Sequence, residues 1–140
     1  MSGPLQVLWL QSGGCGGCTM SLLCAEAPDL LSALDVGGIS LLWHPSLSAA
    51  SGDEVIALLR QVVAGEREID VLCIEGSMLR GPFGSGRFHV LAGTDMPMIQ
   101  WVRDLAARSR YTLAVGTCAA FGGVTAGGPN PAEACGQQVD

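Results

Sequence analysis

Four short apolar segments constrain the fold of this chain most strongly, because each has the length of a strand and each pair is separated by helix-forming sequence. The apolar segments are residues 5–10, 38–43, 69–74 and 111–115. The helix-forming stretches lie at residues 19–27, 51–63 and 96–108. Near-continuous apolar strands that alternate with helices are typical of a parallel sheet covered on both faces. We therefore predict an α/β fold, an open parallel sheet with helices on both faces in a flavodoxin-like or Rossmann-like layout.

Composition favours one domain over residues 1–140 and excludes two kinds of partner. The chain has 140 residues, of which 49% are hydrophobic and 14% charged. A net charge of -6, with seven scattered cationic residues, would repel a nucleic-acid backbone or an anionic membrane. No apolar run approaches the ~20 residues needed to cross a bilayer. A strand beginning at residue 5 leaves no room for a signal peptide, so we expect a cytoplasmic location with neither nucleic-acid binding nor membrane insertion.

Cys15 and Cys18 form a C-x-x-C pair in a Gly-rich loop directly after the first predicted strand. This spacing can wrap two thiolates around one metal or cluster edge, and the glycines let backbone amides turn toward the sulfur atoms. Two other interpretations remain open for the pair alone. It is also compatible with a thioredoxin-like redox pair, or with small buried residues in a turn.

Glu75 and Cys118 follow the third and fourth predicted strands. Ligands of open parallel sheets bind beyond the carboxyl ends of the strands. If the first and fourth strands lie close together, Cys118 joins Cys15 and Cys18 at one edge as a metal site. Zinc is a possible alternative to an iron-sulfur cluster, but structural zinc sites usually draw on two closely spaced pairs, and a second pair is missing. Glu75 is a candidate for proton transfer or for a hydrogen-bonding role beside the site.

The remaining cysteines and the two histidines are weaker candidates. Cys24, within the first predicted helix, and Cys73, within the third strand, are expected to fill the core. Cys135 lies in a segment rich in Gly and Pro that we expect to be an irregular tail. His44 and His89 have no companion ligands nearby in sequence, which favours a structural role for each.

Three segments together resemble the small subunit of nickel-iron hydrogenases, in the same order and with similar spacing. They are residues 8–23 (LWLQSGGCGGCTMSLL), 74–77 (IEGS) and 115–123 (VGTCAAFGG). The resemblance implies a flavodoxin-like domain that carries the proximal 4Fe-4S cluster and takes electrons from the nickel-iron centre of a partner large subunit in a heterodimer. It also implies that Cys15, Cys18 and Cys118 are three of the four cluster ligands.

The family's fourth ligand lies in a downstream Gly-Cys-Pro motif that this sequence lacks, so we expect the 140 residues to be a fragment of a longer subunit. Cys135 matches no ligand position and is predicted not to bind the cluster. An ordinary cubane is also predicted, because Gly17 and Gly123 stand where oxygen-tolerant members of the family have additional cysteines.

Residues 42–47 (LWHPSL) resemble the subgroup of cytoplasmic hydrogen-sensing and uptake enzymes. The hypothesis is thus an electron-transferring hydrogenase subunit, with a further redox or signalling partner in the sensing case. The alternative is a stand-alone iron-sulfur or flavin electron carrier. A third candidate, the related quinone-reductase subunit of respiratory complex I, is disfavoured because its adjacent-cysteine signature is absent.

Overall fold

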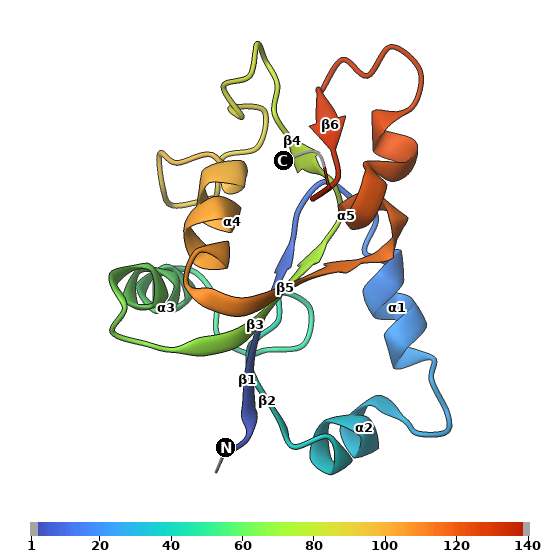
Figure 1. Cartoon of the computed structure of the whole chain (residues 1–140), viewed down its shortest axis with the longest axis vertical. Helices are drawn as coiled ribbons and strands as arrows, with labels where there is room; N and C mark the ends of the chain where they lie inside the picture. The colour runs from blue at the N-terminus through green and yellow to red at the C-terminus, as the bar shows by residue number, and fades with distance from the viewer. Residues whose placement is uncertain (1–2, 139–140) are drawn as a thin grey trace.

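The computed structural model describes residues 3–138 and has a four-stranded parallel sheet at its centre (Figure 1). The strands are β1 (Leu5–Gln11), β2 (Ile39–Trp43), β3 (Ile69–Glu75) and β5 (Ser109–Val115). Their order across the sheet is β2-β1-β3-β5, and every neighbouring pair is parallel. This order matches the first four strands of the flavodoxin-like arrangement, in which the strand order reverses between β1 and β3. The predicted α/β fold class is confirmed.

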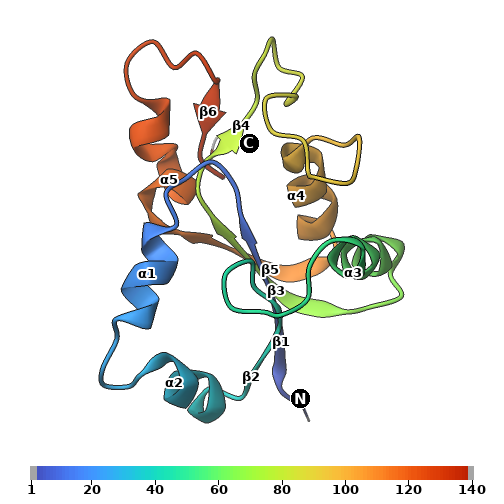
Figure 2. The same ribbon diagram turned by 180° about the vertical axis from the view of Figure 1, so that it is seen from behind.

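Helices cover both faces of the sheet, as Figures 1 and 2 show from opposite sides. One face carries α3 (Asp53–Ala64) and α4 (Met98–Ala106). The other carries α1 (Gly17–Leu23), α2 (Leu30–Val36) and α5 (Gly116–Phe121). All three predicted helices are present, although the first, α1, ends at Leu23 rather than at residue 27, and a separate helix, α2, begins after the Asp29 cap. Gly52 caps α3 without a side-chain hydrogen bond.

The main core lies between the sheet and the pair α3 and α4. Leu8 and Leu72 are fully buried in the sheet and Leu59 and Leu105 are fully buried in the helices. Side chains alternate between the two faces of a strand, so Val7, next to Leu8, points to the opposite face. Burial of each large apolar side chain contributes about 1.5–3 kcal/mol, which makes this face the main source of stability.

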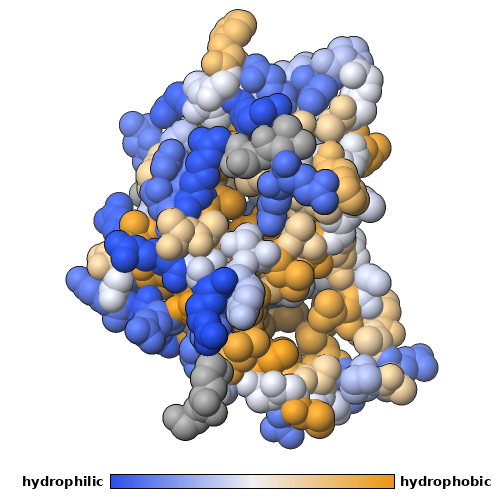
Figure 3. Space-filling view, viewed as in Figure 1, coloured by the Kyte–Doolittle hydropathy of each residue, from blue (hydrophilic) through white to orange (hydrophobic). Residues whose placement is uncertain are grey.

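The opposite face is packed more loosely. A hollow of about 320 Å³ lies between the sheet and the α1 and α2 helices, and its lining is almost wholly apolar. Figure 3 shows apolar side chains surrounding a hollow below the middle of one face of the molecule. Among its lining residues are Trp9, Leu22, Leu34 and Leu113.

A second, two-stranded sheet closes the upper end of the molecule, where β4 (Met78–Leu79) pairs antiparallel with β6 (Ala134–Cys135). A 3-10 helix (Gly123–Ala126) leads toward β6. The expectation of an irregular tail around Cys135 misses this pairing, because two-residue strands leave no periodic pattern in a sequence.

Candidate functional site

The carboxyl ends of three neighbouring strands form one straight row. Gln11 is in register with Glu75, and Glu75 is in register with Val115. The cysteine loop leaves β1 directly after this row, and α5 begins directly after β5. The site therefore lies where the strand order reverses, which is the usual ligand position in such sheets.

All three predicted cysteines lie at this edge. Cys15 is exposed in the loop, while Cys18 in the first turn of α1 and Cys118 in α5 are half-buried. Figures 1 and 2 both show α1 and α5 side by side. The first and fourth predicted strands lie close together without pairing directly, since β3 lies between β1 and β5. Cys118 reaches the others because α5 lies over the end of β3.

The thiols interact electrostatically across the loops that carry them. Burial raises the pKa of Cys18, and negative charge on Glu75, Cys118 and Cys15 raises it further. Within residues 3–138, no three potential ligand side chains lie close enough together to hold a single metal ion. The three sulfur atoms thus share one charged environment without forming a single-ion cage.

Glycines give the sulfur atoms room. A Cβ atom at Gly116, which has φ +83°, would overlap Cys18 Sγ, and one at Gly123 would lie 2.6 Å from Cys118 Sγ. A Cβ atom at Gly17 would lie 3.1 Å from Cys15 Sγ. Each thiol is therefore packed against bare backbone, and the Gly-rich character of both cysteine segments has a steric reason.

Glu75 lies behind the cysteine loop and is only 2% exposed. Its carboxylate accepts hydrogen bonds from Trp9 Nε1 at 3.1 Å, from Gln11 Nε2 at 3.1 Å, and from the Thr19 amide at 3.0 Å and hydroxyl. Burial raises the pKa of Glu75, but these bonds, chiefly those of Thr19, outweigh it and leave the pKa below the ordinary value. The side chain is therefore an ionised carboxylate at neutral pH.

A second set of contacts joins the loops after β1, β3 and α5. The Gly13 and Ser77 backbones exchange two hydrogen bonds of 2.8 Å. The Ser77 hydroxyl, which is fully buried, also donates to Gly13 O at 2.9 Å and lies 2.6 Å from Thr125 Oγ1. A Cβ atom at Gly76 would lie 2.9 Å from the Gly13 backbone, so only glycine permits this approach. The segment IEGS thus fixes the cysteine loop in place.

Sequence reasoning missed Thr19, which is 3% exposed and joins Glu75 to His44. Thr19 Oγ1 lies 3.1 Å from Nε2 of His44, and this histidine is also buried. The structural role predicted for His44 agrees with these contacts. No pattern in the sequence pairs these residues, because they come from separate elements.

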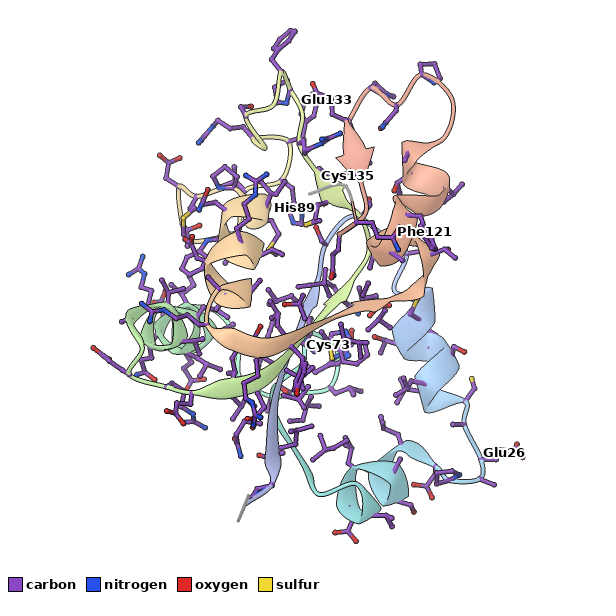
Figure 4. The ribbon with its side chains drawn as sticks, in the orientation of Figure 1. Glu26, Cys73, His89, Phe121, Glu133 and Cys135 are labelled. Atoms are coloured by element: carbon purple, nitrogen blue, oxygen red, sulfur yellow. The ribbon has the colours of Figure 1, made fainter. Side chains whose placement is uncertain are left out.

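The other cysteines differ in exposure. Cys73 is buried in β3 as predicted, and burial raises its pKa to about 11. Cys24 is exposed at the end of α1, so its prediction as a core residue is wrong. Cys135 is 4% exposed in β6 rather than in an irregular polar tail. Figure 4 places Cys135 at the upper sheet, well away from Cys73. His89 is half-buried, and burial lowers its pKa.

Comparison with known proteins decides the family. Residues 15–140 match the family model described as NADH ubiquinone oxidoreductase, 20 Kd subunit. The chain belongs to this family. Its similar relatives include the periplasmic [NiFeSe] hydrogenase small subunit of Desulfomicrobium baculatum, which is 35% identical over 129 residues. The match covers 86% of this chain and 40% of that relative.

One more relative and one solved structure are also hydrogenases. The periplasmic [NiFe] hydrogenase small subunit of Solidesulfovibrio fructosivorans is 33% identical, over 93% of this chain and 40% of the relative. The structure of the [NiFeSe] hydrogenase from Desulfovibrio vulgaris Hildenborough superposes with a TM-score of 0.84 at 30% identity, covering 97% of this chain and 48% of that one. The resemblance to hydrogenase small subunits is confirmed, and the chain spans less than half the length of these relatives.

These relatives overturn the predicted cytoplasmic location, because both curated relatives are named periplasmic. The prediction took the position of the first strand as proof that no signal peptide precedes it, and that inference was wrong. Placement in the sensing subgroup finds no support in the same names and stays a prediction. None of the helices described in residues 3–138 is long and apolar enough to cross a membrane.

Proposed function

We propose that this chain is the cluster-binding part of the electron-transferring small subunit of a nickel-iron hydrogenase. Residues 1–140 would form a flavodoxin-like domain in which Cys15, Cys18 and Cys118 bind a proximal 4Fe-4S cluster. The observation that carries the proposal is the position of three cysteines at the switch point of a parallel sheet, one in the loop after β1, one in the first turn of α1 and one in α5. Hydrogen would be oxidised at the nickel-iron centre of a partner large subunit.

The donor set fits the cluster chemically. Three thiolates near the buried Glu75 charge would repel one another. The pKa of Cys18 is raised first by burial and then further by the negative charges of Glu75, Cys118 and Cys15. Positive iron bound to sulfur relieves that repulsion, because coordination deprotonates a thiol outright. Glycine at positions 116 and 123 leaves space beside the sulfur atoms. The cluster would supply one-electron chemistry, while this chain would hold and shield it.

The chain's own residues would position the site rather than react. The Ser77 contacts fix the cysteine loop against the end of β3, and Gly17 N donates to Cys15 Sγ at 3.4 Å. A fourth ligand is still needed, and we keep the prediction that Cys135 does not provide it. Cys135 is buried in β6, where it pairs with Met78 of β4. The absence of sulfur at Gly17 and Gly123 supports an ordinary cubane.

Exposed apolar side chains favour an obligate partner over a stand-alone carrier. Met20, next to the Cys18 turn, is 61% exposed, and Phe121 and Val124, after Cys118, are 63% and 87% exposed. A carrier that meets its partners briefly would present a mainly polar surface around its cluster, whereas an apolar rim is typical of a permanent interface. We therefore propose that a hydrogenase large subunit covers this edge.

The substitution Cys118→Ser tests the proposed relay in the complete complex with verified nickel content. Loss of one thiolate ligand removes or retunes the cluster. Hydrogen-dependent dye reduction should collapse, while exchange between deuterium gas and water protons continues at the partner's nickel site. Cys24→Ser, which replaces an exposed thiol beyond the site, should leave both rates unchanged. Unchanged dye reduction in Cys118→Ser would remove this residue from the relay.

A further inference from the structure

Glu75 is a buried anion that no cationic side chain pairs with in the part of the chain that the structure describes. Within residues 3–138, no arginine side chain forms a salt bridge with it. A lone buried charge is costly unless hydrogen bonds satisfy it. Here the donors are the Trp9 indole at 3.1 Å, the Gln11 amide at 3.1 Å, and the Thr19 amide and hydroxyl. The fold thus keeps one negative charge at the end of β3.

His44 and Ser46 extend this hydrogen-bond network behind Thr19. The Ser46 amide donates to His44 Nδ1 at 3.0 Å, so the proton of the neutral ring lies on Nε2. Nε2 then donates to Thr19 Oγ1 at 3.1 Å, and the Thr19 hydroxyl donates to Glu75 Oε2. Burial lowers the pKa of His44 despite the opposing effect of Glu75, so the ring stays neutral. Every dipole in the chain of bonds stabilises the carboxylate without adding a positive charge.

The charge also lies close to the cysteines. Glu75 binds the amide of Thr19, the residue that follows Cys18, and it adds to the rise in the pKa of Cys18. An anion beside a cluster disfavours the addition of an electron, because the reduced cluster is one charge more negative. In a partly buried site this repulsion is screened far less than in water.

We propose that Glu75 is a fixed negative charge that lowers the reduction potential of the cluster bound by Cys15, Cys18 and Cys118. Trp9, Gln11 and Thr19 are the positioning residues that keep this carboxylate in place. The proposal rests on the proposed function, since it requires the cluster. The step it controls is a one-electron reduction in which the cluster gains one electron and Glu75 neither gains nor loses a proton.

The test is an EPR-monitored redox titration of the anaerobically purified complex, with two variants that neutralise the charge differently. Glu75→Gln removes the charge, and Gln11→Lys places a cation beside it. Both should raise the midpoint potential. For Glu75→Gln the ratio of reduced to oxidised cluster at a fixed potential should rise about tenfold, which is about 59 mV for one electron.

Two control variants separate charge from packing. Asp70→Asn removes a carboxylate at the other end of the same strand, roughly 17 Å away at 3.3 Å per residue, and should leave the potential unchanged. Gln11→Met removes one hydrogen-bond donor but keeps the Glu75 charge, and should shift the potential much less than Gln11→Lys.

The outcomes also separate this inference from the proposed function. If the unmodified complex contains no cluster at this site, the proposed function fails and this inference fails with it. If the cluster is present and neither Glu75→Gln nor Gln11→Lys changes its potential, only the inference is overturned. An equal shift in Asp70→Asn would also overturn it, because the effect would then not depend on proximity.

Discussion

At the scale of single residues, the site depends on the glycines beside the cysteines as much as on the cysteines themselves. Gly116 and Gly123 lie against Cys18 and Cys118, and any side chain there would enter the space of a sulfur atom. The cysteine spacing in the sequence pointed to a metal site. The partners of Glu75 could not be predicted, because Thr19 and Trp9 look like ordinary helix and strand residues.

Gly116→Ala should abolish cluster binding while the fold persists. The new Cβ would overlap Cys18 Sγ, and the left-handed backbone adds about 1–2 kcal/mol of strain. Gly38→Ala is the matched control, since Gly38 also has positive φ (+60°) but nothing within 4 Å of its added Cβ. The melting temperature should fall by a similar amount in both variants. The iron content should fall only in Gly116→Ala. Full iron retention in Gly116→Ala would contradict the steric argument.

Ionisation of the Cys73 thiol should lower the free energy of unfolding in alkaline solution. Burial raises its pKa from 9.0 to about 11 in the folded protein. The folded state therefore favours the thiol, and this contribution is complete below pH 9 and is lost as the pH rises through 11. Urea unfolding across this range should show a smaller decline in Cys73→Val than in the unmodified protein. Identical pH dependence in the two proteins would show that Cys73 does not titrate as expected.

At the scale of elements, the four long strands were predictable because each is an apolar run bounded by glycine or proline. Their order was not, since nothing in a strand's own sequence shows that β3 separates β1 from β5. The pairing of β4 with β6 was also invisible, because each strand has only two residues. The loops around the cysteines depend on this pairing, as Ser77 directly precedes β4.

Ser77→Ala should loosen the cysteine loop. It removes one buried hydroxyl that contacts Gly13 O and Thr125 Oγ1, at a cost of about 1–3 kcal/mol. Ser85→Ala removes an exposed local bond to Pro82 O and should change stability by less than about 0.5 kcal/mol. Chemical denaturation measures both, and hydrogen exchange of the Gly13 amide reports on the loop. Equal exchange rates in the unmodified protein and Ser77→Ala would rule out this anchoring role.

At the scale of the whole molecule, the two faces of the sheet differ. The face under α3 and α4 has a dense core, whereas the other has a large apolar hollow and the exposed β5 side chains Tyr111 (63%) and Leu113 (53%). The chain spans about 40% of the length of the curated relatives described above. The alternation of apolar and helix-forming segments predicted the α/β fold, but it could not predict how fully each face is covered, because coverage depends on how distant segments pack.

The central claim is that Cys15, Cys18 and Cys118 together bind a 4Fe-4S cluster. Its most direct test is the iron and acid-labile sulfide content of the anaerobically purified protein, combined with EPR spectra of the reduced form. The unmodified protein and Cys24→Ser should each contain about four iron atoms at this site, and the two should give the same EPR spectrum. Serine substitution at Cys15, Cys18 or Cys118 should remove or alter that spectrum. An unchanged cluster after substitution of any of the three would contradict the account.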